Sequence, residues 1–185
     1  MVNSRLLKRL LSLVAIVMFA LVVVWVTYLS ADDNEPEGTH PKPVSALPRQ
    51  VTAGDGTVSL FADYAHAKDD QITLYLVNKT KSAMSFPAQD GDLYIKLERQ
   101  LPDRDWERAQ THAYSWCGNS YHSVDLKPNE FIALKGIYKK TGKAGVVRYR
   151  SFENLSLISN SGQGFVDEAQ VLAARVDDMS KRHVP

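Results

Sequence analysis

The segment SWCGNSYH, residues 115–122, holds the only cysteine of the chain and is the part of the sequence that most plainly offers chemistry. Cys117 lies five residues after His112 and five residues before His122. A thiolate with imidazoles can bind a soft metal ion, and a cysteine beside a histidine base can act as a nucleophile. A packing role is the third option, because free cysteine is among the most often buried residue types.

The tripeptide Trp116-Cys117-Gly118 resembles the start of the thioredoxin-family motif WCGxC or WCGxS, with Ser120 two residues further on. In that family a helix begins at the cysteine, and the helix dipole lowers the pKa of the thiol. Here the following residues, GNSYHSVDL, run toward a strand, and the chain has no second cysteine with which to form a disulfide. The context therefore disfavours a redox site.

The spacing of Cys117 and His122 is similar to that of azurin-like copper proteins, in which a second histidine, here His66 or His112, would complete a His₂Cys site. No methionine stands where the axial ligand would fall. The cytochrome-oxidase copper-delivery proteins are similar in layout, with one anchor, a spacer and an immunoglobulin-like domain, but their CxC motif is absent. The alternative function left open is handling of copper, or thiol chemistry, in the cell envelope by Cys117 with His112 and His122.

Sortase-like transpeptidases also combine a membrane anchor with an all-β catalytic domain, but their TLxTC motif is absent around Cys117. A packing role is favoured, because Gly118 permits positive φ, and Asn119 and Ser120 can hydrogen-bond loop backbone groups. We therefore expect neither an enzyme nor a bound cofactor.

Aromatic and arginine side chains are concentrated around the same loop. The candidates for a binding surface are Trp106, Arg108, Tyr114, Trp116 and Tyr121. Side chains of these types carry much of the energy of protein interfaces, and loops on rigid scaffolds often carry binding. The alternative is that the tryptophans fill the ends of a hydrophobic core.

Residues 10–29 form an uncharged, mostly apolar run of about 20 residues, long enough as a helix to cross the ~30 Å hydrocarbon core of a bilayer. Basic residues precede it within 1–9 and acidic residues follow it, which predicts a cytoplasmic N-terminal tail and an uncleaved anchor. A cleaved signal peptide is disfavoured, because the run is long and no small-x-small site follows it. Residues 30–50 are rich in proline and predict an extended linker that contributes no core element.

Residues 51–178 show the pattern of an extracytoplasmic all-β domain. Apolar and polar residues alternate with period two in several segments, as expected for half-buried strands, and turn residues separate them. The expected strands are 58–63, 72–77, 83–86, 93–98, 106–111, 123–126, 131–138, 145–152 and 155–159. Short strands without long helices between them predict an antiparallel immunoglobulin-like β-sandwich of about seven or eight strands.

The C-terminal part predicts a short helix over about 168–177, with a last strand as the alternative. Asp167 can cap its N-terminus, and Val166 can contact Val171 as a hydrophobic staple. We expect residues 179–185 to form a frayed tail.

The turn sequence LKPNE at 126–130 resembles the L-x-P-G-E turn that many exported bacterial immunoglobulin-like and fibronectin-type-III-like domains place before a strand. The strand over 72–78 and the residues near 158–160 are similar in style to BsuPI-type sandwich domains. The resemblance covers about residues 55–160 and implies the fold, but it assigns no functional residue.

The charge balance excludes one class of partner. Twenty-two Lys and Arg residues face 21 Asp and Glu residues, and no block of like charge stands out, so we do not expect nucleic-acid binding. The sequence instead predicts a single-pass protein of the inner membrane with its domain outside the cytoplasm. The expected function is binding or scaffolding of another envelope protein.

Overall fold

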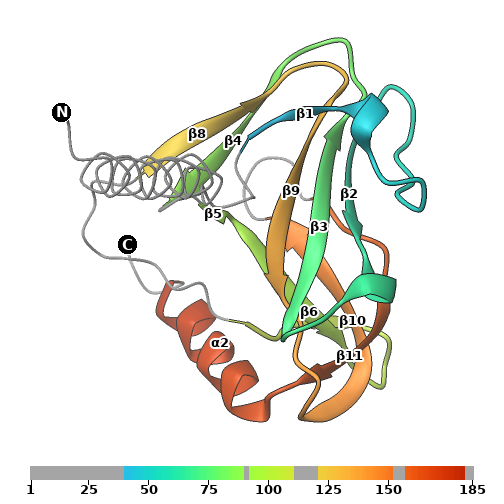
Figure 1. The fold of residues 1–185 in the computed structure, drawn as a ribbon. Helices are drawn as coiled ribbons and strands as arrows, with labels where there is room; N and C mark the ends of the chain where they lie inside the picture. The colour runs from blue at the N-terminus through green and yellow to red at the C-terminus, as the bar shows by residue number, and fades with distance from the viewer. Residues whose placement is uncertain (1–39, 90–91, 111–120, 152–156, 182–185) are drawn as a thin grey trace, which may run out of the picture. The chain divides into compact units, whose positions relative to one another are not determined.

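The structure is a computed structural model, and it describes residues 40–89, 92–110, 121–151 and 157–181 (Figure 1). The chain divides into two compact units, Met1–Glu37 and Gly38–Pro185, and every described residue belongs to the second. The described part of this unit consists mainly of antiparallel strands followed by one C-terminal helix. The prediction of an antiparallel all-β domain that ends in a short helix is therefore confirmed.

The first sheet has the strand order β1-β9-β3-β2. Its strands are β1 (Lys42–Pro43), β2 (Val58–Ala62), β3 (Gln71–Asn78) and β9 (Glu130–Ile137). In β3 the residues Ile72, Leu74 and Leu76 are buried, whereas Thr73 and Tyr75, which alternate with them, are partly exposed. This is the alternation with period two that the sequence predicts.

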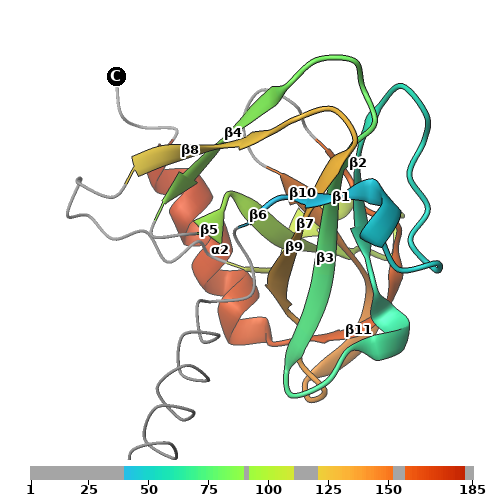
Figure 2. The ribbon, with the colours of Figure 1, turned by 45° about the horizontal axis from the view of Figure 1, so that its top comes forward.

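The second sheet has the order β11-β10-β6-β7, and a third, smaller sheet has the order β5-β4-β8. The strands of the second sheet are β6 (Ile95–Gln100), β7 (Trp106–Arg108), β10 (Lys143–Ser151) and β11 (Gly162–Val166). Those of the third are β4 (Met84–Gln89), β5 (Asp92–Leu93) and β8 (Tyr121–Leu126). Figure 2 shows the β4–β8 pair extending beyond the two larger sheets.

One hydrophobic core joins the three sheets and the helix. It contains Leu74 of the first sheet, Leu97 and Tyr149 of the second, Phe86 of the third and Val171 of the helix. The first and second sheets therefore face each other across a shared core, as the layers of a sandwich do.

The described residues form eleven strands rather than seven or eight. The expected strand over 93–98 is divided between β5 and β6. The segment expected at 155–159 contributes only an isolated bridge between Ile158 and Arg150 within its described part. The sequence of β11, GQGFV, does not predict a strand, because it is rich in glycine. Gly162 is required there, since a Cβ at this position would lie 2.5 Å from ring atoms of Tyr64.

The prediction that residues 30–50 contribute no core element is wrong for its C-terminal part. β1 pairs with β9, and the Val44 N–H donates to the Asn129 carbonyl oxygen at 2.9 Å. Val44 and Leu47 then pack on a second apolar cluster of Val51, Val77 and Phe131. The prolines led to the prediction of a linker, but proline is also compatible with a packed segment at the edge of a sheet.

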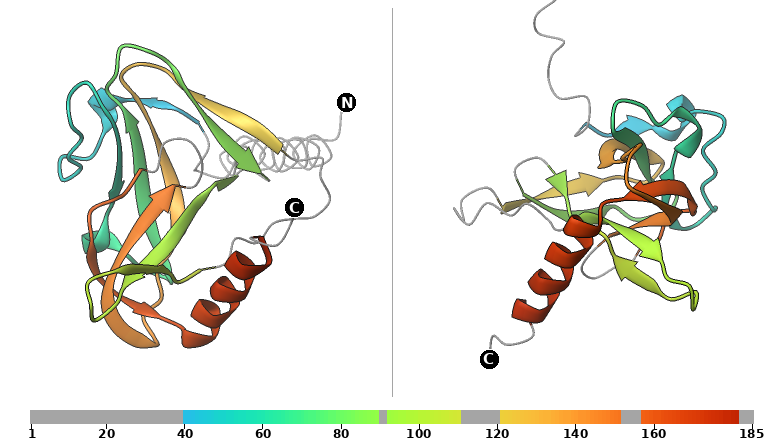
Figure 3. Two further views of the ribbon diagram at one scale, coloured as in Figure 1. Left: turned by 180° about the vertical axis from the view of Figure 1, so that it is seen from behind. Right: turned by 90° about the horizontal axis from the view of Figure 1, so that it is seen from below.

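The predicted helix over 168–177 is observed as α2 (Glu168–Lys181), which follows directly on β11 (Figure 3). The Ala169 N–H donates to Asp167 Oδ1 at 2.9 Å, so the predicted cap is present, and Val166 and Val171 are both buried in the same hydrophobic core. The alternative of a last strand is wrong. Residues 179–181, expected to belong to a frayed tail, are instead part of α2, and residues 182–185 lie outside the described residues.

The predicted anchor at 10–29 lies outside the described residues. Of the helices in the described ranges, none has both the length and the apolar character needed to cross a bilayer.

Candidate functional site

The residues predicted to form a binding surface fall into three groups. Trp106 and Arg108 lie on β7 in the second sheet, and Tyr121 is the first residue of β8 in the third sheet, with 59% of its surface exposed. Tyr114 and Trp116 lie outside the described residues. Within the described part of the chain, the structure therefore brings Trp106 and Arg108 together and places Tyr121 on a different sheet.

Of the three residues of the alternative metal site, only His122 lies within the described residues. His122 lies on β8 and is exposed, whereas Cys117 and His112 lie outside the described residues. In the ranges that the structure describes, no group of three His, Cys, Asp or Glu side chains is close enough to hold a metal ion. His66, the other imidazole considered for copper, instead contacts Asp63 through Nδ1 at 2.9 Å.

Trp106 and Arg108 belong to a polar surface on the side of the second sheet that faces away from the core. Leu97, Val147 and Tyr149 point into the core, so their neighbours along β6 and β10 point outward. The register aligns Arg108 with Glu98 on β6, and Glu98 with Arg148 on β10. We call this surface the arginine face, and its members are Lys96, Glu98, Trp106, Arg108, Arg148 and Arg150.

Glu98 fixes two of the arginines. Arg148 Nε donates to Glu98 Oε2 at 2.7 Å, and Arg150 Nε donates to Glu98 Oε1 at 2.6 Å. The Arg148 guanidinium carbon lies 3.9 Å from the centroid of the Trp106 ring, which is a cation–π geometry. Arg148 and Arg150 therefore occupy defined positions, although 14% and 28% of their side chains remain exposed.

Among the described residues that make up the arginine face, Lys96, Arg108, Arg148 and Arg150 are cationic and Glu98 is a carboxylate. Lys96 and Arg108 make further polar interactions, so Arg148 and Arg150, which share Glu98, are the candidate cations for binding. Lys96 is only 2% exposed, so it is buried beneath this face and adds little to its accessible charge. The face as a whole is suited to an anionic group.

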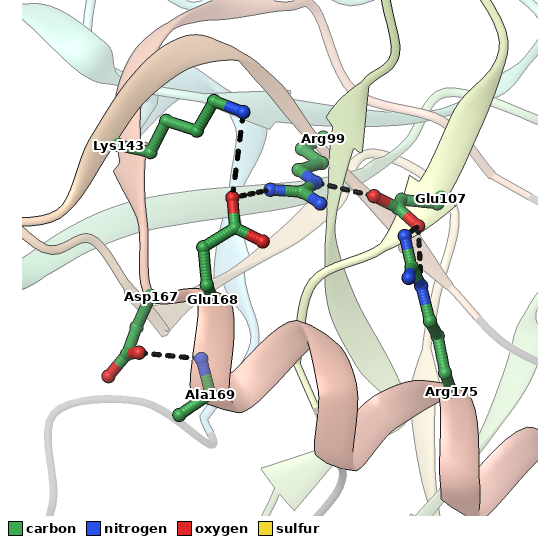
Figure 4. Close-up of polar contacts among 7 residues, drawn as sticks. All are labelled: Arg99, Glu107, Lys143, Asp167, Glu168, Ala169 and Arg175. Atoms are coloured by element: carbon green, nitrogen blue, oxygen red, sulfur yellow. Dashed lines mark hydrogen bonds and ion pairs between the residues drawn. The ribbon is translucent and has the colours of Figure 1, made fainter.

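A second polar cluster lies on the opposite side of the same sheet, where α2 packs against β7 (Figure 4). Arg99 Nε donates to Glu107 Oε1 and Arg99 Nη1 donates to Glu168 Oε1, both at 2.5 Å. Glu107 Oε2 accepts from Nη2 and Nε of Arg175 at 2.6 and 3.0 Å. Lys143 Nζ lies 3.8 Å from Glu168 Oε1. The cluster thus links β6, β7, β10 and α2.

These contacts shift the pKa values of the carboxyl groups downward. The hydrogen bond from Arg99 lowers the pKa of Glu168. Burial alone would raise the pKa of Glu107, but the hydrogen bonds from Arg175 and Arg99 outweigh it and leave this pKa below its ordinary value. The hydrogen bond to Glu168 correspondingly raises the pKa of Arg99. Both carboxyls are therefore ionised at neutral pH.

A cavity of about 250 Å³ opens beside this cluster. Its lining includes Arg99 and Lys143 together with the apolar groups of Leu101, Pro102 and Val166.

Neither polar cluster was predicted from the sequence, although part of the signal was present. Arg148 and Arg150 are two residues apart in a strand, as are Lys96 and Glu98, and that spacing places each pair on one face.

Comparisons with known proteins add no assignment: the chain matches no family model, no curated protein and no solved structure.

Proposed function

We propose that this chain is a membrane-anchored binding module, which displays its β domain outside the cytoplasmic membrane and holds an acidic segment of another envelope protein on the arginine face. One observation carries the proposal. Arg148 and Arg150 are both fixed by Glu98, and Arg148 also lies over the Trp106 ring, so two guanidinium groups share a single carboxylate there. Fixed guanidinium groups lose less side-chain entropy on binding than mobile ones, and arginine and tryptophan are enriched among residues that dominate interface energy.

The chemistry of the face favours carboxylates. Each guanidinium has five N–H donors, and the bonds to Glu98 engage only the Nε of each arginine. Carboxylates of a partner can therefore form charge-assisted hydrogen bonds with the remaining N–H groups. Binding of this kind weakens as salt concentration rises, because the participating charges are partly exposed.

The proposed location rests on the sequence. The apolar run at 10–29, with basic residues before it and acidic residues after it, supports an anchor with its N-terminus in the cytoplasm. We also infer an immunoglobulin-like class for the domain. The strand orders β2-β3-β9 and β11-β10-β6-β7 correspond to the A-B-E and G-F-C-C′ arrangements of that class, which supports this inference.

Photocrosslinking of the full chain in its own membranes tests the function. A photoreactive residue at Gln163, an exposed position on β11 on the same side of the sheet, should yield a discrete crosslinked protein. The same residue at Lys135, exposed on β9, should not. Mass spectrometry of the product should identify a protein with an acidic segment.

The purified partner then allows a binding measurement with matched variants. Arg150→Gln should weaken binding about tenfold. Lys135→Gln removes one charge from the first sheet and should leave binding unchanged. Equal crosslinking from positions 163 and 135, or unaltered binding by a folded Arg150→Gln variant, would refute the arginine face as the binding surface.

A further inference from the structure

The cavity beside α2 combines an apolar floor with a cationic rim. Leu101, Pro102 and Val166 supply apolar surface, and Arg99 and Lys143 supply positive charge. At about 250 Å³ it is slightly smaller than the roughly 300–1,000 Å³ of most ligand pockets. It holds the volume of about eight water molecules in the liquid, which corresponds to a ligand of the size of a short-chain carboxylic acid.

Part of this cavity is open because Gly145 has no side chain. Gly145 lies in the middle of β10 and is one of the lining residues. A Cβ placed on Gly145 would meet no atom within 4 Å, so it would project into open space. In contrast, a Cβ at Gly164, the partner of Gly145 across β11, would lie 2.6 Å from Val147 Cγ2. Gly145 is thus not required by packing, and its lack of a side chain keeps the cavity open.

Among the described residues, the polar cluster beside the cavity has one more cation than it has carboxylates. Arg99, Lys143 and Arg175 are linked to Glu107 and Glu168, so three cations face two carboxylates (Figure 4). The distances identify Lys143 as the loosely held cation. Its Nζ is 3.8 Å from Glu168 and 73% of its side chain is exposed, whereas Arg99 is bonded at 2.5 Å to both carboxylates. The arrangement complements a monoanion whose charge approaches Lys143.

We infer that this cavity is a binding site for a small organic monocarboxylate, with the carboxylate held by Lys143 and Arg99 and the apolar chain lying over Gly145 against Leu101 and Val166. The two carboxylates engage Nε and Nη1 of Arg99, and a guanidinium offers five N–H donors in all. The site lies on the opposite side of the sheet from the arginine face. It does not depend on the function proposed for that face.

Nuclear magnetic resonance titration of the isotope-labelled full chain in detergent micelles tests the inference, with hexanoate as the probe and hexanamide as its uncharged counterpart. Hexanoate should produce saturable shifts at the amides of Lys143 and Gly145. Hexanamide should bind at least about fivefold more weakly, because it lacks the charge that Lys143 and Arg99 complement.

Three variants make the titration specific. Gly145→Val fills the cavity with a residue that strands accept well, and it should abolish the saturable shifts. Lys143→Gln should weaken hexanoate binding about fivefold. Lys139→Gln removes a nearby charge that does not line the cavity and should have no effect. Shifts that rise without saturation, or that persist in a folded Gly145→Val variant, would overturn the site.

Discussion

At the scale of single residues, Asn160 gives the edge of the first sheet a partner that is not a strand. β2 ends the order of that sheet, and its residue Ala62 donates its N–H to Asn160 Oδ1 at 2.7 Å. Asn160 Nδ2 in turn donates to the Ala62 carbonyl oxygen at 3.0 Å. The carboxamide thus forms the two hydrogen bonds that an adjacent strand would otherwise form.

Replacing Asn160 by alanine should therefore destabilise the domain. Ala62 is 1% exposed, so its N–H and carbonyl groups would lose their partner in a buried position, at a cost of about 1–3 kcal/mol in the free energy of unfolding. Urea unfolding of the full chain in mild detergent, followed by circular dichroism, measures this change. Ser161→Ala is the matched control at the exposed neighbouring position. A difference below about 0.5 kcal/mol between the two variants would contradict the role assigned to the carboxamide.

Two glycines in paired strands should respond oppositely to the same substitution. In Gly162→Ala the new Cβ would collide with the Tyr64 ring, so we expect a loss of about 1–3 kcal/mol. In Gly145→Ala the Cβ enters open space, and the more restricted unfolded chain should leave stability unchanged or raised by up to about 1 kcal/mol. The urea midpoints of the two variants test this contrast. Similar losses in both would show that glycine is needed in these strands for a reason other than side-chain space.

At the scale of elements, α2 is held by apolar contacts in the core and by the polar bridge at Glu107. Val171 and Ala174 are buried, while Leu172 is 62% exposed, so one face of the helix packs on the domain. Glu107 receives hydrogen bonds from Arg99 on β6 and from Arg175 on α2. This carboxylate therefore connects the helix to the second sheet.

The bridge predicts how stability depends on acid. The pKa of Glu107 in the folded state lies below its ordinary value of 4.5, so the stabilisation that it provides is complete above that pH and is lost as the pH falls below it. Glu107→Gln should lower stability by about 1 kcal/mol at neutral pH and flatten the acid limb of a stability profile. Asp55→Asn, at a carboxyl that is 96% exposed, is the control. An acid limb equally steep in both variants would refute the role of Glu107.

The elements also show what a sequence can and cannot specify. Alternation in β3 and the capping residue Asp167 are local patterns, and both predicted their elements. β1 and β11 depend on distant partners: β1 pairs with β9, and β11 contains glycines required by Tyr64 and Val147. Trp106 and Arg108 were identified by residue type, but their association with Arg148 requires the register of β10, β6 and β7, which no local pattern records.

At the scale of the whole molecule, two tyrosines connect the sheets: Tyr149, which is buried, and Tyr64, which is partly buried. Tyr64 donates its hydroxyl to the Val147 carbonyl oxygen at 2.9 Å, and Tyr149 donates its hydroxyl to the Ile137 carbonyl oxygen at 2.6 Å. The Tyr64 bond connects the segment that follows β2 with the second sheet, and the Tyr149 bond connects the second sheet with the first. Burial raises the pKa of Tyr64 and of Tyr149 above the ordinary value of 10.0.

The raised pKa values of Tyr64 and Tyr149 predict a loss of stability at alkaline pH. Because the folded-state pKa values are raised, the folded protein retains these protons more tightly than the unfolded chain does, and stability falls as the pH rises above about 10. Urea midpoints measured on either side of this pH should show the decline. Tyr149→Phe should make it shallower, whereas Tyr121→Phe, at an exposed position, should not. Identical alkaline slopes for both variants would contradict the assignment.

The short strand β1 also has a mechanical consequence for a domain held by its N-terminal side. β1 contains only two residues, so a pull on the preceding chain loads this pairing and the Val44 contact before it reaches β2. Peeling residues 42–51 away would release about ten residues, or about 35 Å of extended chain. The second apolar cluster, with Val44 and Leu47, would be lost in this step, while the main core and the arginine face would remain folded. In the membrane-anchored arrangement proposed above, tension on the N-terminal chain would therefore release these residues before it disturbed the arginine face.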